Sequence, residues 1–150
     1  MRFQRLQGVI LGVAIGLSAG IGGFTFVYAR GASYLTNESA ACANCHVMRP
    51  YFDAWLKSSH RAVAACNDCH TPHGFVRKCL VKAWNGFRHS LAFTTGHFPD
   101  SLHIKPYNHD VVEEACRRCH EEIVQAIEGP DGTGPALSCV RCHDSVGHLR

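Results

Sequence analysis

Four copies of one five-residue pattern, Cys-x-x-Cys-His, carry most of the reactive side chains in this sequence. Two thiols one helical turn apart can add across the two vinyl groups of a haem, and the histidine that follows brings an imidazole to one face of the iron. A zinc site or a thioredoxin-type redox pair would not need a histidine after every pair. The pattern therefore predicts four covalently attached haem c groups, held by Cys42, Cys45, Cys66, Cys69, Cys116, Cys119, Cys139 and Cys142.

Each iron can take two axial ligands, and the motif histidines supply at most one each: His46, His70, His120 and His143. Seven other histidines are available as second ligands. His148 follows His143 by five residues and is better placed to reach a neighbouring haem than its own. His60 ends a predicted helix over residues 51–59 and can reach a haem of the other pair. We therefore predict that His60 and His148 are distal ligands.

A thioether stands two residues after the first motif histidine. Met48 is a candidate ligand of the first iron, with His46 as the alternative, and it can also serve as a packing residue against the macrocycle. A thioether ligand raises the potential of a haem relative to two imidazoles. Such a haem would suit the point where electrons enter.

The elements that position these motifs begin with a membrane anchor. An uncharged apolar stretch of 21 residues, 8–28, is long enough to cross the hydrocarbon layer, and it exceeds the apolar region of a cleavable signal peptide, which is the alternative. Arg2 and Arg5 are expected to stay on the cytoplasmic side. We therefore predict a basic head and anchor over residues 1–30 in the inner membrane and a periplasmic haem domain over residues 31–150.

Glycines recur every fourth position in the predicted anchor, at Gly8, Gly12, Gly16 and Gly20. Such a face lets a second transmembrane helix approach closely, so self-association through the anchor is possible.

The composition limits the fold class and the partners. About 120 residues must surround four macrocycles, so the haems take the place of a side-chain core. This favours a mainly α fold with extensive loops, in which one transmembrane helix precedes a small tetrahaem cytochrome domain. The net charge of +3 and the absence of a basic run argue against nucleic acid as a partner. The ninth cysteine, Cys79, is expected to be a small buried side chain.

The motif spacing suggests two dihaem units. The first cysteines of motifs one and two are 24 residues apart and those of motifs three and four are 23 apart, with 50 between the pairs. We predict haem pairs over residues 42–70 and 116–143, with an insertion over 71–115.

The insertion has a predicted helix of its own. A turn precedes a helix over residues 75–93, whose charges are all positive, as expected for a helix that lies on anionic membrane lipid. A loop is expected over 96–108, helices over 111–119 and 121–127, and a linker over 129–135.

Together these features resemble the NapC/NirT family of membrane-anchored multihaem quinol dehydrogenases. The likeness rests on the single anchor, the four motifs, Cys42-x-x-Cys45-His46-x-Met48, the stretch 82–96 and the terminal Cys142-His143-x-x-x-Gly147-His148. The short chain is most similar to the small subunits of cytochrome c nitrite reductases. The resemblance implies oxidation of menaquinol at the outer face of the membrane and electron transfer to a periplasmic pentahaem nitrite reductase.

The resemblance also implies roles for single residues. It implies that Met48, rather than His46, holds the first iron, that Lys82 belongs to the quinol site, and that one haem of the first pair takes a lysine from the partner reductase. Relatives have a carboxylate seven residues after this lysine, where the chain has His89. An imidazole there can accept a quinol proton, or it can bind the first iron instead.

Two other functions remain open from the sequence. The chain can be a membrane-tethered relay that takes electrons from another protein without binding quinol, or a donor to another periplasmic reductase. A catalytic reductase is disfavoured, because few residues remain to build a substrate pocket.

Overall fold

The structure is a computed structural model that describes residues 2–129 and 137–148. Its elements in chain order are α1 (Arg2–Tyr28), η1 (Gly31–Leu35), α2 (Ser39–Cys42), η2 (His46–Met48), α3 (Arg49–Trp55), η3 (Ser59–Ala62), α4 (Cys66–His70), α5 (Phe75–Thr95), α6 (Pro106–Cys119), α7 (Glu121–Glu128) and α8 (Cys139–Cys142), where η marks a 3-10 helix. The described residues contain no strand. This confirms the predicted mainly α fold with long connections.

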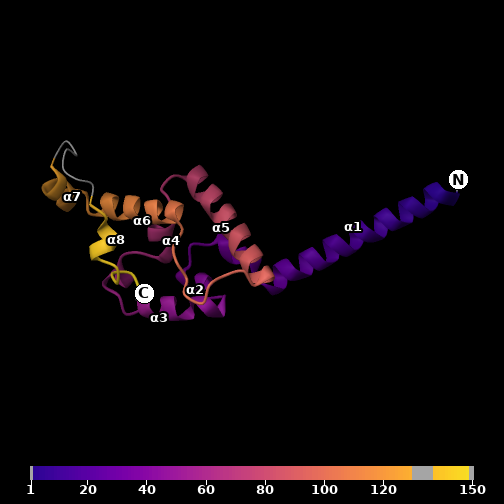
Figure 1. The fold of residues 1–150 in the computed structure, drawn as a ribbon, viewed down its shortest axis with the longest axis horizontal. Helices are drawn as coiled ribbons and strands as arrows, with labels where there is room; N and C mark the ends of the chain where they lie inside the picture. Colours follow the sequence, from indigo (N-terminus) through magenta and orange to yellow (C-terminus); the bar gives the residue numbers. More distant parts are fainter. Residues whose placement is uncertain (1, 130–136, 149–150) are drawn as a thin grey trace. The chain divides into compact units, whose positions relative to one another are not determined.

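The chain divides into two compact units, one ending at Ser33 and the other beginning at Tyr34. The first unit contains α1, drawn in indigo in Figure 1. With 27 residues and a mean hydropathy of 2.0 in its most apolar window, α1 is the one helix in the described ranges that is long and apolar enough to cross a membrane. Arg2 and Arg5 lie within its first turns, so the basic head continues the helix.

The second unit packs short helices around few buried side chains. Helix α4 lies against α6, which also contacts α7 and α8, while α2 contacts α3 and α4 (Figure 1). The buried apolar side chains of the described residues are Val81, Val111 and Ala115, which belong to α5 and α6. A core this small agrees with the expectation that the haems themselves fill the interior of the domain.

Helix α5 is joined to α6 by polar contacts on both sides of that small core. Arg77 donates two hydrogen bonds of 3.2 Å to the carboxylate of Glu114. The amides of Asn85 and Asn108 bond to each other in both directions, at 3.1 and 3.2 Å. These contacts set which face of α5 is turned toward α6.

Glycine marks both ends of α5. Gly74 precedes it with φ of +93°, and Gly96 ends it in the left-handed conformation with φ of +69°, where a side chain would be strained. The predicted helix over 75–93 is therefore confirmed and extends two residues further. Cys79 on this helix is exposed, so the expectation that it is buried was wrong. The fold buries only one side chain of α5, that of Val81.

Other predicted element boundaries also differ from the structure. Helix α3 ends at Trp55 rather than at residue 59, because the chain tightens into 3-10 turns there and the indole of Trp55 donates to the carbonyl of Ala64 at 3.1 Å. Helix α6 begins at Pro106, inside the predicted loop, since proline suits the first helical position. Helix α7 runs one residue beyond its predicted end. The predicted linker lies outside the described residues except for Gly129.

Candidate functional site

The four Cys-x-x-Cys-His motifs lie on or beside short helical segments. The second motif forms α4, the paired cysteines of the fourth form α8, the third ends α6, and the first begins at the last residue of α2. A helical turn places residues i and i+3 on one side, so the two thiols of such a motif face the same way. This is the local arrangement that attachment of one haem requires.

The motifs follow one another in space as they do along the chain. The thiol of Cys42 is hydrogen-bonded to that of Cys66, which raises the pKa of Cys42 and lowers the pKa of Cys66. Cys69 in turn lies within electrostatic range of Cys119, and Cys116 within range of Cys139. The arrangement therefore puts motif one beside two, two beside three and three beside four.

One carboxylate from the third-motif helix caps the fourth motif. Glu113 accepts hydrogen bonds from the Ser138 hydroxyl at 2.7 Å and from the backbone N–H groups of Cys139 and Val140 at 2.9 and 3.2 Å. Burial would raise the pKa of Glu113, but these bonds outweigh it and lower the pKa to about 2. The ionised carboxylate thus fixes α8 against α6, at the start of the last haem motif.

Two pairs of imidazoles face each other across motif boundaries. The rings of His70 and His148 have centroids 6.0 Å apart and planes only 7° apart. Those of His60 and His120 have centroids 6.1 Å apart and planes at 70°. The structure thus brings both predicted distal histidines to a motif histidine. In each pair one ring belongs to residues 42–70 and the other to the chain beyond residue 115.

The spacing of the rings fits an iron held between them. A metal–imidazole bond of about 2 Å on each side, together with the radii of two five-membered rings, gives a centroid separation of about 6 Å. The Nδ1 of His148 is buried and has no hydrogen-bond partner among the described residues. Burial lowers the pKa of His70 to about 4, with smaller contributions from His148 and His89, which favours the neutral ring that a metal needs.

The first and fourth motif histidines have other surroundings. The ring of His46 packs edge-on against Phe93, with centroids 6.4 Å apart, and Met48 lies at the end of η2, half-buried. Within the described ranges, His143 makes no ring contact with a second imidazole. The choice between Met48 and His46 therefore stays a prediction, as does an incomplete ligand set within this chain.

Lys82 lies in a network that ties α5 to the segment before the first motif. Its ammonium group donates to the Thr36 carbonyl at 2.7 Å and to Oδ1 of Asn37 at 2.9 Å. The amide of Asn67 on α4 donates to the same two acceptors, at 3.2 and 3.3 Å. Burial lowers the pKa of Lys82, and the neighbouring charge of Lys78 lowers it further.

His89 lies two turns further along the same face of α5. Its Nδ1 is 3.1 Å from the hydroxyl of Tyr34, and the protein around it lowers its pKa although water reaches the ring. The ring of Tyr34 covers Gly86, the residue between Lys82 and His89 on this face, where an added Cβ would come within 3.2 Å of it. Burial raises the pKa of Tyr34 to about 12, and the thiols of Cys45 and Cys42 add to the shift, so Tyr34 is close to the first motif.

The residues that contact Lys82 and His89 could not be recognised from the sequence. Tyr34, Thr36 and Asn37 lie in a polar connection between the predicted anchor and the first haem motif, and their residue types indicated no role. Asn67 lies between the two cysteines of a motif, at a position without a required residue type. Glu113 could not have been found, because its three donors follow it by 25 to 27 residues.

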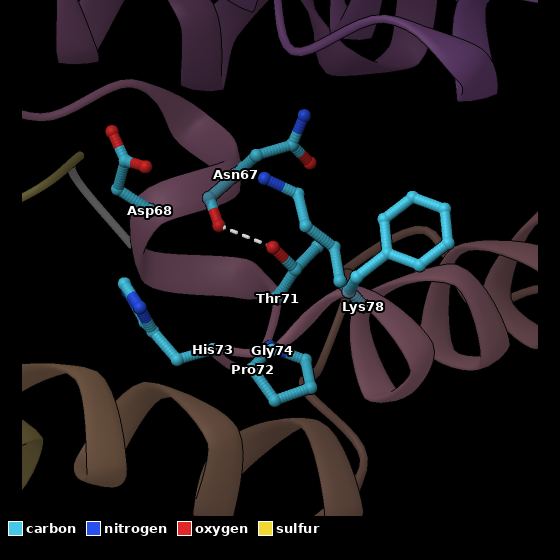
Figure 2. Close-up of a pocket in the computed structure, with 8 residues that line it drawn as sticks. Asn67, Asp68, Thr71, Pro72, His73, Gly74 and Lys78 are labelled. Carbon is cyan, nitrogen blue, oxygen red and sulfur yellow. Dashed lines mark hydrogen bonds between the residues drawn. The ribbon is translucent and has the colours of Figure 1, made fainter.

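Two of the small hollows among the described residues border α5. One, of about 150 Å³, lies between α4 and the start of α5, and Figure 2 shows the Lys78 side chain reaching across it toward Asn67. The other, of about 230 Å³, is lined by Leu80, Val81, Trp84 and Tyr107. Neither of these two hollows is lined by Lys82 or His89.

The arrangement of the haem motifs agrees with the protein family that the sequence matches. The profile described as "NapC/NirT cytochrome c family, N-terminal region" matches residues 4–150. The chain belongs to the NapC/NirT cytochrome c family. Membership in this cytochrome c family implies covalently bound haem c, as the motifs predicted, and a membrane helix of the kind that α1 provides.

Two NapC/NirT relatives resemble the chain over most of its length. It is 36% identical over 155 residues to the cytochrome c-type protein NrfH of Wolinella succinogenes, covering 93% of this chain and 82% of that protein. It is 30% identical over 146 residues to the cytochrome c nitrite reductase subunit NrfH of Nitratidesulfovibrio vulgaris, covering 97% and 86%.

A solved structure resembles this NapC/NirT chain as a whole. It is a chain of the crystal structure of the cytochrome c nitrite reductase NrfHA complex bound to the HQNO inhibitor. The TM-score is 0.67, with 29% sequence identity over 98% of this chain and 91% of that chain. The likeness therefore covers the haem motifs and the α5 region together.

Proposed function

We propose that this chain is a membrane-bound tetrahaem cytochrome that oxidises menaquinol at the periplasmic face and passes electrons to a periplasmic pentahaem nitrite reductase. The names of the two NrfH relatives and of the NrfHA complex support the assignment to a nitrite reductase assembly. The observation that carries the quinol assignment is the placing of Lys82 and His89 on one face of α5, beside the segment that leads into the first haem motif.

Oxidation of a quinol releases two protons and two electrons. Lys82 and His89 can each interact with a hydroxyl group from which a proton leaves. Lys82 can donate a hydrogen bond to a quinol oxygen, because its third ammonium hydrogen has no acceptor among the described residues. His89, with its lowered pKa, is neutral near pH 7 and can accept a proton from the hydroxyl. The haems, when bound, supply one-electron chemistry.

The same proposal assigns the haem ligands. Met48, with His46 as the alternative, holds the first iron; His70 with His148 and His120 with His60 hold the second and third; and His143 holds the fourth. Cross-motif pairs of this kind make each haem site depend on two distant stretches of chain. The fourth site has no second imidazole among the described residues, so its second ligand is left unassigned.

Helix α5 provides the surface of the domain that we propose contacts the membrane. Val76, Leu80, Trp84, Phe87 and Leu91 recur on one side of this helix, and all are at least 50% exposed. Four basic residues and no acidic one lie on the helix, and the guanidinium of Arg88 covers the Trp84 ring at 5.6 Å. Such a face suits anionic lipid, with α1 as the retained anchor and its N-terminus in the cytoplasm. Self-association through the glycine face of α1 is a further element of the proposal.

The test uses the purified full-length cytochrome in detergent. Lys82→Met and His89→Ala should each lower menaquinol oxidation by at least about tenfold while four haems remain attached, since each removes one polar group from the reacting quinol. Lys78→Met is the matched control, a lysine one turn earlier on the same helix. Unchanged turnover in both variants would contradict the quinol site.

One observation favours a second function. The Lys82 ammonium group already bonds to Thr36 and Asn37, so the lysine can be a structural link in a relay that never binds quinol. In that case Lys82→Met would reduce haem content or stability, and neither variant would change the response to the inhibitor HQNO.

A further inference from the structure

Residues 34–37 cross the face of α5 that carries both proposed quinol residues. The Tyr34 hydroxyl is 3.1 Å from Nδ1 of His89, and the Thr36 carbonyl and Asn37 side chain accept from Lys82 at 2.7 and 2.9 Å. We call residues 34–37 the strap. No other segment in the described ranges forms a hydrogen bond with either side chain.

The following inference depends on the quinol site proposed above. We propose that the strap is the positioning element of the quinol site. Asn37 orients Lys82 so that one ammonium hydrogen remains to donate to the oxygen of a quinol hydroxyl. Tyr34 orients His89 so that one imidazole nitrogen remains to accept the hydrogen of that hydroxyl. Neither residue touches the quinol itself.

The hydrogen-bond inventory of Lys82 supports this role. An ammonium group has three donors, and the strap takes two of them, which fixes the direction of the third. A lysine on a flexible four-carbon stem would otherwise sample many directions. The strap therefore reduces the entropy that Lys82 would lose when a quinol oxygen binds.

The strap is itself fixed from a second side. Asn67 on α4 donates to both strap acceptors that Lys82 uses, at 3.2 and 3.3 Å. The Thr36 hydroxyl accepts from the backbone N–H of Glu38 at 3.1 Å, which holds the strap in its turn. Lys82 is thus oriented by a network that also includes the second haem motif, rather than by one loose loop.

Tyr34 plays the corresponding part for His89. Contact of its ring with Gly86 fixes the tyrosine over α5, and the hydroxyl then meets one nitrogen of the imidazole. When His89 donates from Nδ1 to Tyr34, Nε2 keeps its lone pair for the proton of the substrate. A larger residue at position 86 would displace the tyrosine and leave the imidazole without this partner.

The experiment measures the dissociation constant of HQNO for the full-length haem-loaded cytochrome in detergent, together with haem content. Asn37→Leu removes the side-chain acceptor for Lys82, leaving only the Thr36 carbonyl, and should weaken HQNO binding about tenfold. Asn37→Asp keeps an oxygen that accepts from both Lys82 and Asn67 and should stay within about twofold of the parent. Tyr34→Phe keeps the ring on Gly86 and should weaken binding by about fivefold.

A double-mutant cycle shows whether Asn37 acts through Lys82. Asn37→Leu should weaken binding in the parent but add less than about twofold in a Lys82→Met background. Asn108→Leu is the matched control, because it breaks a hydrogen-bonded amide pair to α5 in which no strap residue takes part. It should leave HQNO binding unchanged.

The outcomes separate the strap from the quinol assignment. If Lys82→Met weakens HQNO binding and Asn37→Leu does not, the strap has no positioning role and the quinol site stands. Additive losses in the double mutant, or a loss as large in Asn108→Leu, would also overturn the strap. If Lys82→Met and His89→Ala leave binding unchanged, the proposed quinol site itself is wrong.

Discussion

His70 and His148 lie with their imidazole planes 7° from parallel and their centroids 6.0 Å apart, although 78 positions separate them in the sequence. The first belongs to the second haem motif and the second follows the fourth. A ring supplied from so far along the chain makes the two predicted dihaem units interdependent.

Replacement of His148 with alanine should open the second iron on one side. We expect one additional haem per chain to bind carbon monoxide in the reduced protein, because only an iron with a vacant or weak sixth position does so. His103→Ala, which removes a histidine outside both ring pairs, is the control. An unchanged carbon monoxide spectrum would contradict His148 as a ligand of the second iron.

Two low-spin signals should distinguish the two imidazole pairs. Parallel rings, as in His70 and His148, split the energies of the iron dπ orbitals more than the rings of His60 and His120, whose planes meet at 70°. The EPR spectrum of the oxidised protein should therefore contain one rhombic and one strongly anisotropic signal. His148→Ala should remove the first signal and His60→Ala the second. Loss of the same signal in both variants would contradict the assigned pairs.

Because of Glu113, the free energy of unfolding should decrease as the pH falls below 4.5. Its pKa is about 2 in the folded chain against an ordinary value of 4.5, so its contribution is present above pH 4.5 and is lost as the pH falls from 4.5 toward 2. Glu113→Gln should lower the free energy of unfolding by on the order of 1–2 kcal/mol at pH 7 and by much less near pH 2. Urea unfolding followed by circular dichroism at several pH values measures this.

The neighbouring carboxylate is the control for that series. Glu114 forms an exposed ion pair with Arg77, with side chains 51% and 58% accessible, and such pairs contribute little. Glu114→Gln should therefore change stability far less at every pH. Equal losses in the two variants would mean that Glu113 does not act as the cap of α8.

The exposed thiol of Cys79 can report on the membrane face of α5. It is the one cysteine outside the haem motifs, and it lies on the helix proposed to contact lipid. Maleimide labelling should be slower in vesicles rich in anionic lipid than in detergent, because the lipid surface shields the helix. A Cys79→Ser, Glu122→Cys variant places the thiol on α7 instead and should label equally fast in both. Equal rates at Cys79 would argue against lipid contact.

The sequence predicted the features that depend on local pattern. The haem motifs, the apolar span and the α5 helix each follow from spacing within a few residues, and the structure places all three near the expected positions. The choice of His60 and His148 as haem ligands, made from reach along the chain, stays a prediction, although each ring lies near that of a motif histidine. The boundaries of α3 and α6 were missed, because a tryptophan hydrogen bond and a proline at a helix start decided them.

The network around α5 could not be predicted, for a physical reason. Lys82, Asn37 and Asn67 come from three segments, and ordinary polar residue types give no sign of which distant acceptor they meet. Cys79 shows the opposite error: residue type suggested burial, but the fold leaves that side of the helix uncovered. Tertiary contacts, not local propensity, decide both cases.

The distance along the chain between His70 and His148 also bears on how the protein matures. A chain that crosses the membrane from its N-terminal end presents Cys66 and Cys69 to the haem attachment machinery well before residue 148 emerges. For that interval the second haem would be anchored to the polypeptide with one side of its iron exposed to water and to oxidants. With His148 as the proposed second ligand, this site would close only after residue 148 has crossed the membrane.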